Sequence, residues 1–430
     1  MNILIALLVL SLLILIHELG HFTAAKLNGI RVLEFSMFMG PKLFSFKKGE
    51  TQYTLRLIPM GGFVKMEGEE TASDDPRAFS AQKIWKRVAV IAAGPIMNIV
   101  LAFVLMTIYM MNTNVMTNQV SEFGPNSSLK AAGLEVGDTL TSWNGRKIHD
   151  FRTDMTMFLY GADNKPIDIK WEKPDGSKHE AVMNLYKTPP IYRLGFSVIS
   201  DGDEATNVVD LVEPNTPLEA AGGKSGDVIV KIDDQVVANR DDIVNYLNYG
   251  RGEENPPISV TVLRNGEERT FTDVTPFADS YFTIDTDFKV EEVGFGGAIV
   301  SSAKYSNSTI RMVFTTVGWL FTGHATLKDL SGPVGIVGTI GTVVAREHTI
   351  ADKLLSLASL GALLSLNLGV MNLIPFPALD GSKLVLLLIE KVRKKPLAPE
   401  KEGIISLVGF SLLILLLLAT LVNDIPRWIL

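Results

Sequence analysis

Five residues near the beginning of the chain, His17-Glu18-Leu19-Gly20-His21, form an H-E-x-x-H pattern. On a helix, residues four apart share a face, so both imidazoles can reach one zinc ion with the glutamate beside it as general base. The pattern ends an apolar run, and ionisable groups within a membrane helix are costly unless they have partners. The alternative is that these groups lie at the cytoplasmic interface, in contact with water.

A catalytic zinc ion needs a third protein ligand and an open position for water. The chain has no cysteine, which leaves histidine and carboxylate side chains as the available ligands. Asp380, in Leu379-Asp380-Gly381, is the candidate because it lies at a depth in its apolar segment similar to that of His17 and His21. The alternative is that Asp380 is an ordinary N-cap of the helix that follows it.

The composition fits a chain that is partly embedded in lipid. Of its 430 residues, 47% are hydrophobic and 20% charged, and the mean hydropathy is +0.24. Apolar spans that alternate with ordinary soluble domains would explain both values. The net charge of −7 and the absence of a basic or aromatic cluster argue against a nucleic-acid partner.

Three segments are long and apolar enough to cross a bilayer as single helices, roughly residues 3–27, 88–111 and 404–422. A fourth stretch, 354–390, is too long for one straight helix, and two prolines and Gly381 interrupt it. We predict a spanning helix to about Leu373, a break, and a short helix over 382–390. Broken backbone at membrane depth survives only when buried in protein or lining a polar cavity, so the break is a candidate site.

Basic residues predict the orientation. Lysines and arginines are concentrated between the first two spans and just before the last span. By the positive-inside rule both stretches face the cytoplasm. Four spans then place both termini and the long middle region outside.

The middle region contains an internal repeat. Residues 130–138 (KAAGLEVGD) recur 89 residues later as residues 219–227 (EAAGGKSGD), and alternating strand patterns follow each copy. The small-small-Gly and Gly-Asp signature resembles that of PDZ domains, which hold extended peptides or chain ends by adding a strand to a sheet edge. The alternative is a pair of small β-rich spacers without ligands.

Together, these motifs in their order along the chain resemble the site-2 protease family of intramembrane zinc metalloproteases. Besides H-E-x-x-H and the repeats, the resemblance is carried by Gly94-Pro95-Ile96-Met97-Asn98, Ser331-Gly332-Pro333 and the stretch 367–381. It covers essentially the whole chain. It implies that His17, His21 and Asp380 hold Zn²⁺ and that Glu18 activates water. It also implies that Asn372 and Asn367 match asparagines that orient the substrate backbone.

Residues 31–66 resemble the membrane-reentrant β-loop of that family. Residues 35–38 and 51–57 alternate apolar and polar side chains, and Met60-Gly61-Gly62-Phe63 is predicted to form a turn. A substrate unwound in lipid needs partners for its amides, and a hairpin dipping into the membrane offers an edge strand. The alternative is a cytoplasmic hairpin that makes no contact with substrate.

The resemblance implies hydrolysis of peptide bonds in or near the transmembrane segments of single-span membrane proteins. The implied substrates are a pre-cut anti-sigma factor and remnant signal peptides, and the implied place is a bacterial inner membrane with periplasmic termini and PDZ domains. The PDZ domains would then act as a size-exclusion filter. The main alternative is a catalytically silent, PDZ-bearing membrane scaffold, which would not need Glu18. A transporter is disfavoured because four spans show no inverted repeat of the broken helix.

The expected fold is a multi-domain polytopic membrane protein. It has four transmembrane helices, a membrane-associated β-hairpin and two extracytoplasmic PDZ domains of the β-rich α+β class. The first and last parts, 1–116 and 351–430, hold the spans in pairs, and the hairpin belongs to the first. The PDZ domains are expected at 117–200 and 201–300, and interfacial amphipathic helices at 301–350.

Overall fold

The computed structural model describes residues 2–69, 73–201, 204–213, 216–251, 255–326, 330–346, 349–395 and 399–428. The chain divides into two compact units. The first unit comprises residues 1–119, 139–161 and 288–428, and the second comprises residues 120–138 and 162–287.

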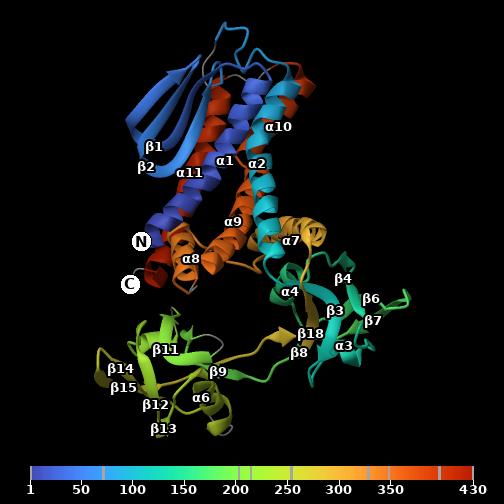
Figure 1. Cartoon of the computed structure of the whole chain (residues 1–430), viewed down its shortest axis with the longest axis vertical. Helices are drawn as coiled ribbons and strands as arrows, with labels where there is room; N and C mark the ends of the chain where they lie inside the picture. Colours follow the sequence, from blue (N-terminus) through green and yellow to red (C-terminus); the bar gives the residue numbers. More distant parts are fainter. Residues whose placement is uncertain are drawn as a thin grey trace. The chain divides into compact units, whose positions relative to one another are not determined.

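Among the described residues, four helices of the first unit are long and apolar enough to cross a membrane, as the sequence predicts. They are α1 (Asn2–Leu27), α2 (Ile84–Met111), α9 (Ile350–Leu373) and α11 (Pro399–Trp428). A helix satisfies its backbone groups internally, which is what an apolar run needs in lipid. Helix α2 packs between α1 and α9 (Figure 1). Helix α11 exposes a series of leucines such as Leu407, Leu415 and Leu418, a surface that fits lipid better than water.

The third span is broken where the sequence predicts. Helix α9 ends at Leu373, turns follow over residues 374–379, and α10 (Asp380–Arg393) begins. Pro375 and Pro377 account for the break, because proline lacks the N–H that a helix needs and disfavours helical backbone in the residue before it.

Gly381 allows the two parts of the broken span to meet. A Cβ atom added at Gly381 would lie 2.3 Å from the carbonyl oxygen of Ile374 and 2.4 Å from that of Leu373. Any side chain here would therefore push the first turn of α10 away from the end of α9. The close contact holds Asp380 next to the end of the spanning helix.

Strands β1 (Val32–Lys48) and β2 (Thr51–Met66) form an antiparallel pair in the first unit. The chain reverses at residues 49–50 and again between Leu55 and Gly62, because residues 52–55 run in the same direction as 34–37 whereas residues 62–66 run antiparallel to 32–37. The turn predicted at 60–63 therefore coincides with the second reversal, although these residues lie within the bounds of β2. Gly61 has φ 81°, a backbone conformation that glycine adopts readily in a turn. Residues 62–66 pair with 32–37, whereas 51–56 pair mainly with 42–48.

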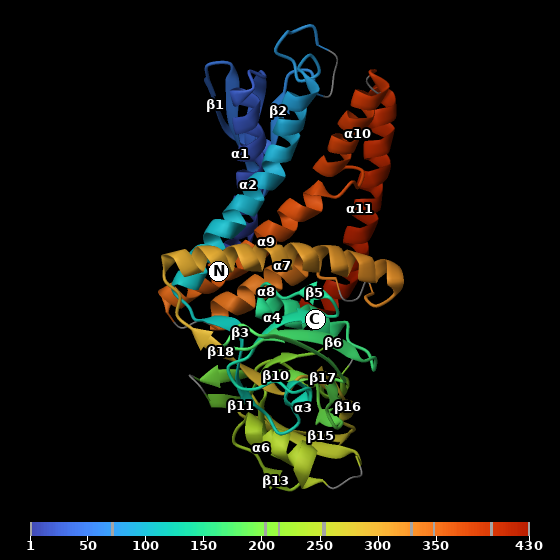
Figure 2. The same cartoon turned by 90° about the vertical axis from the view of Figure 1, so that its right-hand side faces the viewer.

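Helices α7 (Phe295–Thr322) and α8 (Pro333–Arg346) occupy the segments expected to be amphipathic, although α7 begins earlier than predicted. Figure 2 shows α7 lying across the ends of α2 and α9. Helix α7 buries small and polar residues such as Ser302 and Thr309 and exposes aromatic residues such as Phe314 and Phe321. The outward apolar face agrees with an interfacial helix.

The N-terminus of α8 is capped by a carboxylate from the last span. Asp424 of α11 is 1% exposed and accepts hydrogen bonds from the N–H of Gly332, at 3.2 Å, and of Gly335, at 2.8 Å. A negative group is stabilised at the N-terminus of a helix. The Ser331-Gly332-Pro333 motif therefore has a structural role, since Gly332 leaves room for the carboxylate.

The internal repeat is confirmed by matching elements at the same offset. Helix α3 (Ser128–Ala131) and strands β4 (Thr139–Trp143) and β5 (Arg146–Lys147) recur 89 residues later as α5 (Pro217–Ala220), β12 (Val228–Ile232) and β13 (Gln235–Val236). The second copy belongs to a sheet with the strand order β10-β11-β12-β14-β15. The remaining strands of that sheet are β10 (Phe196–Asp201), β11 (Glu204–Val212), β14 (Ile258–Arg264) and β15 (Glu267–Val274). Its core includes the fully buried Leu218, Ile229 and Val260.

The second copy is inserted within the first. Two short ribbons, β8 (Tyr186–Lys187) with β17 (Phe282–Thr283) and β9 (Ile191–Arg193) with β16 (Phe277–Asp279), lead into and out of it. Strand β18 (Thr286–Glu291) then lies beside β3 (Val115–Phe123), which precedes the first copy. The consecutive ranges 117–200 and 201–300 therefore miss this nesting, because a sequence repeat does not show which strands pair.

The other elements are the helical parts of the two copies and one further hairpin, which belongs to the first copy's sheet. They are α4 (Phe151–Tyr160), β6 (Ile167–Glu172), β7 (Lys178–Met183), α6 (Arg240–Asn245) and the π-helical turn Tyr246–Gly250. Strands β6 and β7 are antiparallel: Ile167 pairs with Met183 at one end, and Glu172 pairs with Lys178 at the other. They lie in the sheet of order β18-β3-β4-β6-β7.

Candidate metal centre

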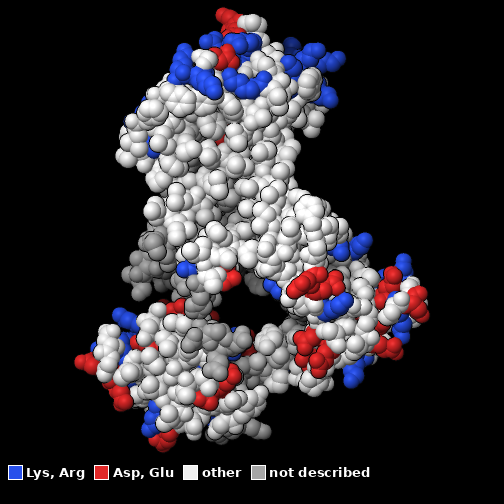
Figure 3. Space-filling view, viewed as in Figure 1, with Lys and Arg blue, Asp and Glu red and all other residues white. Residues whose placement is uncertain are grey.

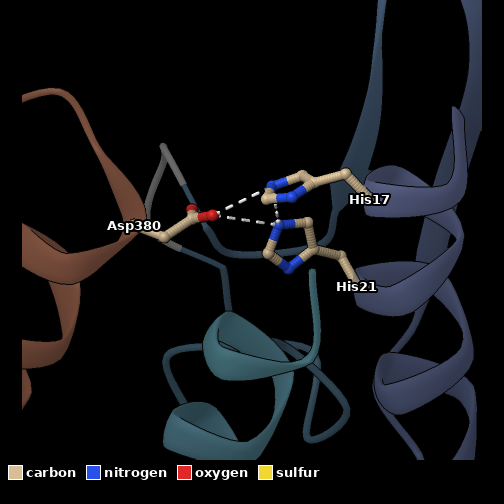
Figure 4. A group of neighbouring side chains, drawn as sticks. All are labelled: His17, His21 and Asp380. Atoms are coloured by element: carbon tan, nitrogen blue, oxygen red, sulfur yellow. Dashed lines mark hydrogen bonds and ion pairs between the residues drawn. The ribbon is translucent and has the colours of Figure 1, made fainter. Parts of the chain in front are cut away.

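Three predicted ligands meet between α1 and α10. The Nε2 atom of His17 lies 3.0 Å from Oδ2 of Asp380 and 3.1 Å from Nε2 of His21. The Nε2 atom of His21 lies 3.4 Å from the same carboxylate oxygen. Figure 4 shows the three side chains pointing toward one another.

The spacing of these atoms fits one zinc ion. Zinc binds histidine nitrogen and carboxylate oxygen at about 2.0–2.1 Å, and tetrahedral geometry then separates its ligand atoms by about 3.3 Å. The three observed separations, 3.0, 3.1 and 3.4 Å, bracket that value. Two imidazoles and one carboxylate supply three ligands, which leaves the fourth position open for water.

The carboxylate of Asp380 is not used as a helix cap. The N-cap position of α10 is occupied by Leu379, and Asp380 is the first helical residue. Its Oδ2 atom is instead directed at the two imidazoles. The N-cap alternative for Asp380 is therefore wrong.

Helix α2 supports both histidines from behind. The Nδ1–H of His21 donates to the carbonyl oxygen of Val90 at 2.9 Å. The side-chain amide of Asn98 lies 3.3 Å from Nδ1 of His17. Sequence reasoning noted Asn98 only as part of a motif, because a contact 81 residues apart leaves no local pattern.

Gly94 is what lets α2 approach the histidines. A Cβ atom added at Gly94 would lie 2.4 Å from Nε2 of His21 and 2.9 Å from Nε2 of His17. Both atoms belong to the proposed ligand set, so a side chain at this position would displace them. The Gly94–Asn98 motif thus combines a close approach with a polar contact.

A pocket of about 250 Å³ opens beside the three ligands. It is lined by Ile14, His17, Glu18, Leu368, Asn372, Ala378, Leu379 and Asp380. The structure therefore brings Glu18 and Asn372 to the same space, which is large enough for a water molecule. Asn367 is not among the lining residues, and its buried Oδ1 atom has no hydrogen-bond partner among the described residues.

Strand β2 passes close to Glu18. An ideal Cβ atom on Gly62 would lie 3.4 Å from Cγ of Glu18. About two turns earlier on the same face of α1, the Oγ–H of Ser11 donates to the carbonyl oxygen of Pro59 at 2.8 Å. These contacts hold residues 59–62 of β2 against α1 at the level of the pocket.

Two ion pairs fix α10, which carries Asp380. Lys383 donates to Glu69, in the loop after β2, at 2.8 Å. Nearer the end of α10, Glu390 accepts two hydrogen bonds from Arg87 of α2, at 2.9 and 3.0 Å. The helix that carries the carboxylate ligand is thereby tied both to the loop after β2 and to the helix that supports the histidines.

We expect Gly94→Ala to reduce the amount of metal that the purified chain retains, because the added methyl group would displace both imidazoles. Metal content measured by elemental mass spectrometry checks this expectation. Gly403→Ala is the matched control, since a Cβ atom at this glycine of α11 meets no atom within 4 Å. Equal metal content in the two variants would contradict the close approach of α2.

Comparison with known proteins places the chain in a family. The model of Peptidase family M50 matches residues 5–416. The zinc metalloprotease RasP of Geobacillus kaustophilus is 32% identical over 98% of this chain and 97% of its own length. The regulator of sigma-E protease RseP of Escherichia coli is 30% identical over 97% of each chain.

A solved structure of the HtrA3 PDZ domain covers 22% of this chain and 90% of its own, at 17% identity and a TM-score of 0.18. That score is too low to argue for a shared fold, so the PDZ interpretation rests on the repeat itself. The family match and the full-length relatives do decide the broader assignment: this chain belongs to Peptidase family M50, the site-2 proteases, and is a multi-pass membrane zinc metalloprotease.

Proposed function

We propose that this chain is an endopeptidase that cuts single-span membrane proteins in or near their transmembrane segments. His17, His21 and Asp380 hold the zinc ion, and Glu18 is the general base. The observation that carries the proposal is the meeting of these ligands on a membrane-spanning helix and on the helix that follows a broken span. Asn372, which lines the same pocket, is the residue proposed to bind the substrate backbone.

In the proposed mechanism, bound zinc supplies Lewis acidity and lowers the pKa of its water to about 7. Glu18 accepts the proton of the attacking water and passes it to the amine that leaves. Asn372 donates from its side-chain amide to a substrate carbonyl, which holds the scissile bond beside Glu18. Val90 keeps the ring of His21 oriented through the 2.9 Å hydrogen bond. The surrounding spans limit the access of bulk water.

We expect Glu18→Gln to abolish cleavage and to leave zinc binding intact, because the amide cannot accept the proton but Glu18 is not a ligand. General-base removal costs roughly 10²–10⁴-fold in rate. Cleavage of a tagged single-span substrate and zinc content are measured on the same preparation. Glu122→Gln, an exposed carboxylate on β3, is the control and should match wild type. Full cleavage by Glu18→Gln would contradict the general-base role, and absence of cleavage by the wild-type chain would support the silent-scaffold alternative.

The substrate class follows from the site and from a relative. The E. coli relative is named as a regulator of sigma-E protease, which supports an anti-sigma factor with one span, already cut once, as the substrate. Remnant signal peptides are single apolar helices too and would fit the same site. Neither substrate calls for a nucleic-acid partner.

We propose that the β1–β2 sheet is associated with the membrane and pairs with the unwound substrate. Its support is the closeness of Gly62 to Glu18, together with exposed apolar side chains such as Leu43, Phe44 and Phe46. Residues 62–66 lie at an outer edge of the sheet, because among the described residues they pair only with β1 residues 32–37. An edge strand beside the general base would accept an extended peptide.

Proline at this edge tests the pairing. Successive N–H groups of a strand point to opposite sides, so one of Phe63 and Val64 has an N–H that faces away from β1. Proline at that position removes this outward donor, whereas proline at the other removes a donor that faces β1. We expect the outward-facing position to lose cleavage and keep zinc. Ser45→Pro, in the other outer segment of the sheet, is the control. Normal cleavage by both edge variants would contradict substrate pairing at residues 62–66.

The orientation is proposed from charge. Lys83 and Lys86 at the beginning of α2, and Lys391 and Arg393 at the end of α10, lie at one end of the membrane helices, where Figure 3 shows basic residues gathered. The positive-inside rule puts that end in the cytoplasm of a bacterial inner membrane. Both termini and the two repeats, proposed to be PDZ domains, then lie in the periplasm.

The repeats are proposed to exclude substrates that still carry a large periplasmic domain. The antiparallel β9–β16 ribbon brings Ile191 opposite Asp279, so joining residue 190 to residue 280 removes the second copy with little strain. We expect this variant to cut both the full-length and the trimmed substrate, whereas the intact chain cuts only the trimmed one. Gel analysis of both substrates decides.

Two controls accompany this excision. Glu18→Gln in the shortened chain should abolish both cleavages. In the intact chain, which has no native cysteine, a single cysteine at the exposed turn residue Asn265 should react with an impermeant thiol reagent added outside. A shortened chain that cuts the trimmed substrate but does not cut the full-length substrate would contradict size exclusion by the second copy.

A further inference from the structure

Asn98 of α2 carries a polar side chain whose contacts are incomplete. It is fully buried, and its Nδ2 atom lies 3.3 Å from Nδ1 of His17. Its Oδ1 atom is buried without a hydrogen-bond partner among the described residues. The nitrogen and oxygen of a side-chain amide have nearly the same shape, so a rotation of 180° exchanges them without other movement.

The neighbouring histidine decides which atom must face it. The Nε2 atom of His17 points at His21 and Asp380, so it is the atom that offers a lone pair to the metal. A neutral imidazole then carries its proton on Nδ1 and is a donor there. An amide NH₂ group opposite this donor would give two donors and no acceptor. The oxygen of Asn98 in the same place gives a hydrogen bond and a partner for a buried acceptor.

We propose that Asn98 is a positioning residue of the metal centre, whose Oδ1 atom accepts a hydrogen bond from the Nδ1–H of His17. This bond fixes the tautomer of His17 and the plane of its ring. It rests on the proposed metal-binding role of His17 and extends it to a residue outside the ligand set.

The arrangement around His21 supports the same role. Its Nδ1–H already donates to an acceptor on α2, the carbonyl oxygen of Val90, at 2.9 Å. Metal-bound histidines generally donate their second N–H to such an acceptor, which orients the ring and raises its basicity. Both ligating histidines would then be oriented by α2, one through the main chain and one through a side chain.

Helix α9 holds Asn98 in place. The Oγ–H of Ser365, which is fully buried, donates to the main-chain oxygen of Asn98 at 2.8 Å. A Cβ atom at Gly369 would lie 3.3 Å from Cβ of Asn98, so α9 packs closely against this turn of α2. A buried asparagine can also serve only to join helices. Zinc affinity separates the two roles, because a helix-joining residue has no direct effect on the ligand.

The test measures the zinc dissociation constant of the full chain in lipid nanodiscs, by competition with a chelator. Asn98→Leu has a similar volume but no acceptor, and we expect zinc binding roughly 10–100-fold weaker. Asn98→Asp keeps an oxygen toward His17 and loses the amide donor, and its affinity should equal or exceed that of wild type. Ser365→Ala is the packing control: it should lower the melting temperature and leave zinc affinity unchanged.

Two results would overturn the proposal: wild-type affinity in Asn98→Leu, or an Asn98→Asp variant as weak as Asn98→Leu. If Asn98→Leu does not fold, Asn98→Ala, which adds no bulk, is judged by the same criteria. The failure of the underlying metal site looks different. In that case the wild-type chain would bind zinc no better than His17→Ala.

Discussion

The structure depends on gathering three polar ligands inside an apolar helix bundle. A buried ionisable group is tolerated only when each of its polar atoms has a partner. Here the two imidazoles and the carboxylate face one another through Nε2 and Oδ2, and the outward Nδ1 atoms face α2. The packing of the other helices brings these three side chains together.

Two features bring the elements close enough. Gly94 removes the side chain that would separate α2 from the imidazoles, and Gly381 lets α10 begin directly against the end of α9. The break before α10 exposes backbone groups that only a protein-lined environment can satisfy. The pocket with Glu18 and Asn372 lies at that break, so the same departure from a regular helix positions a ligand and makes room for substrate.

Much of the site could be predicted from the sequence because its signals are local. The i, i+4 spacing of His17 and His21, the prolines that end α9 and the apolar lengths of the spans each follow from the geometry of one helix. Asp380 could be chosen by depth because both helices cross the same layer. Asn98 could not be given a role, since its contact with His17 depends on how α1 and α2 pack. Asn367 was expected near the substrate, but the structure leaves it outside the pocket lining.

The sheets show both the reach and the limit of sequence patterns, which indicate where strands and turns lie but not how the strands pair. In the first unit, the turn composition of residues 60–63 correctly indicates a reversal of the chain, at which Gly61 has a positive φ. In the repeats, the 89-residue offset located matching elements correctly. The return of β18 to β3 had no such signal, so the nesting of one copy inside the other emerged only from the strand order.

The cap of α8 by Asp424 limits how the last span can move. If α11 tilted away at this end, the N–H groups of Gly332 and Gly335 would lose their acceptor in largely apolar surroundings, at a cost of about 1–3 kcal/mol each. The carboxylate thus acts as a pivot, and the easier displacement of α11 is a swing of its opposite end. Because α8 packs along α1, that pivot is fixed to the helix that carries the histidines.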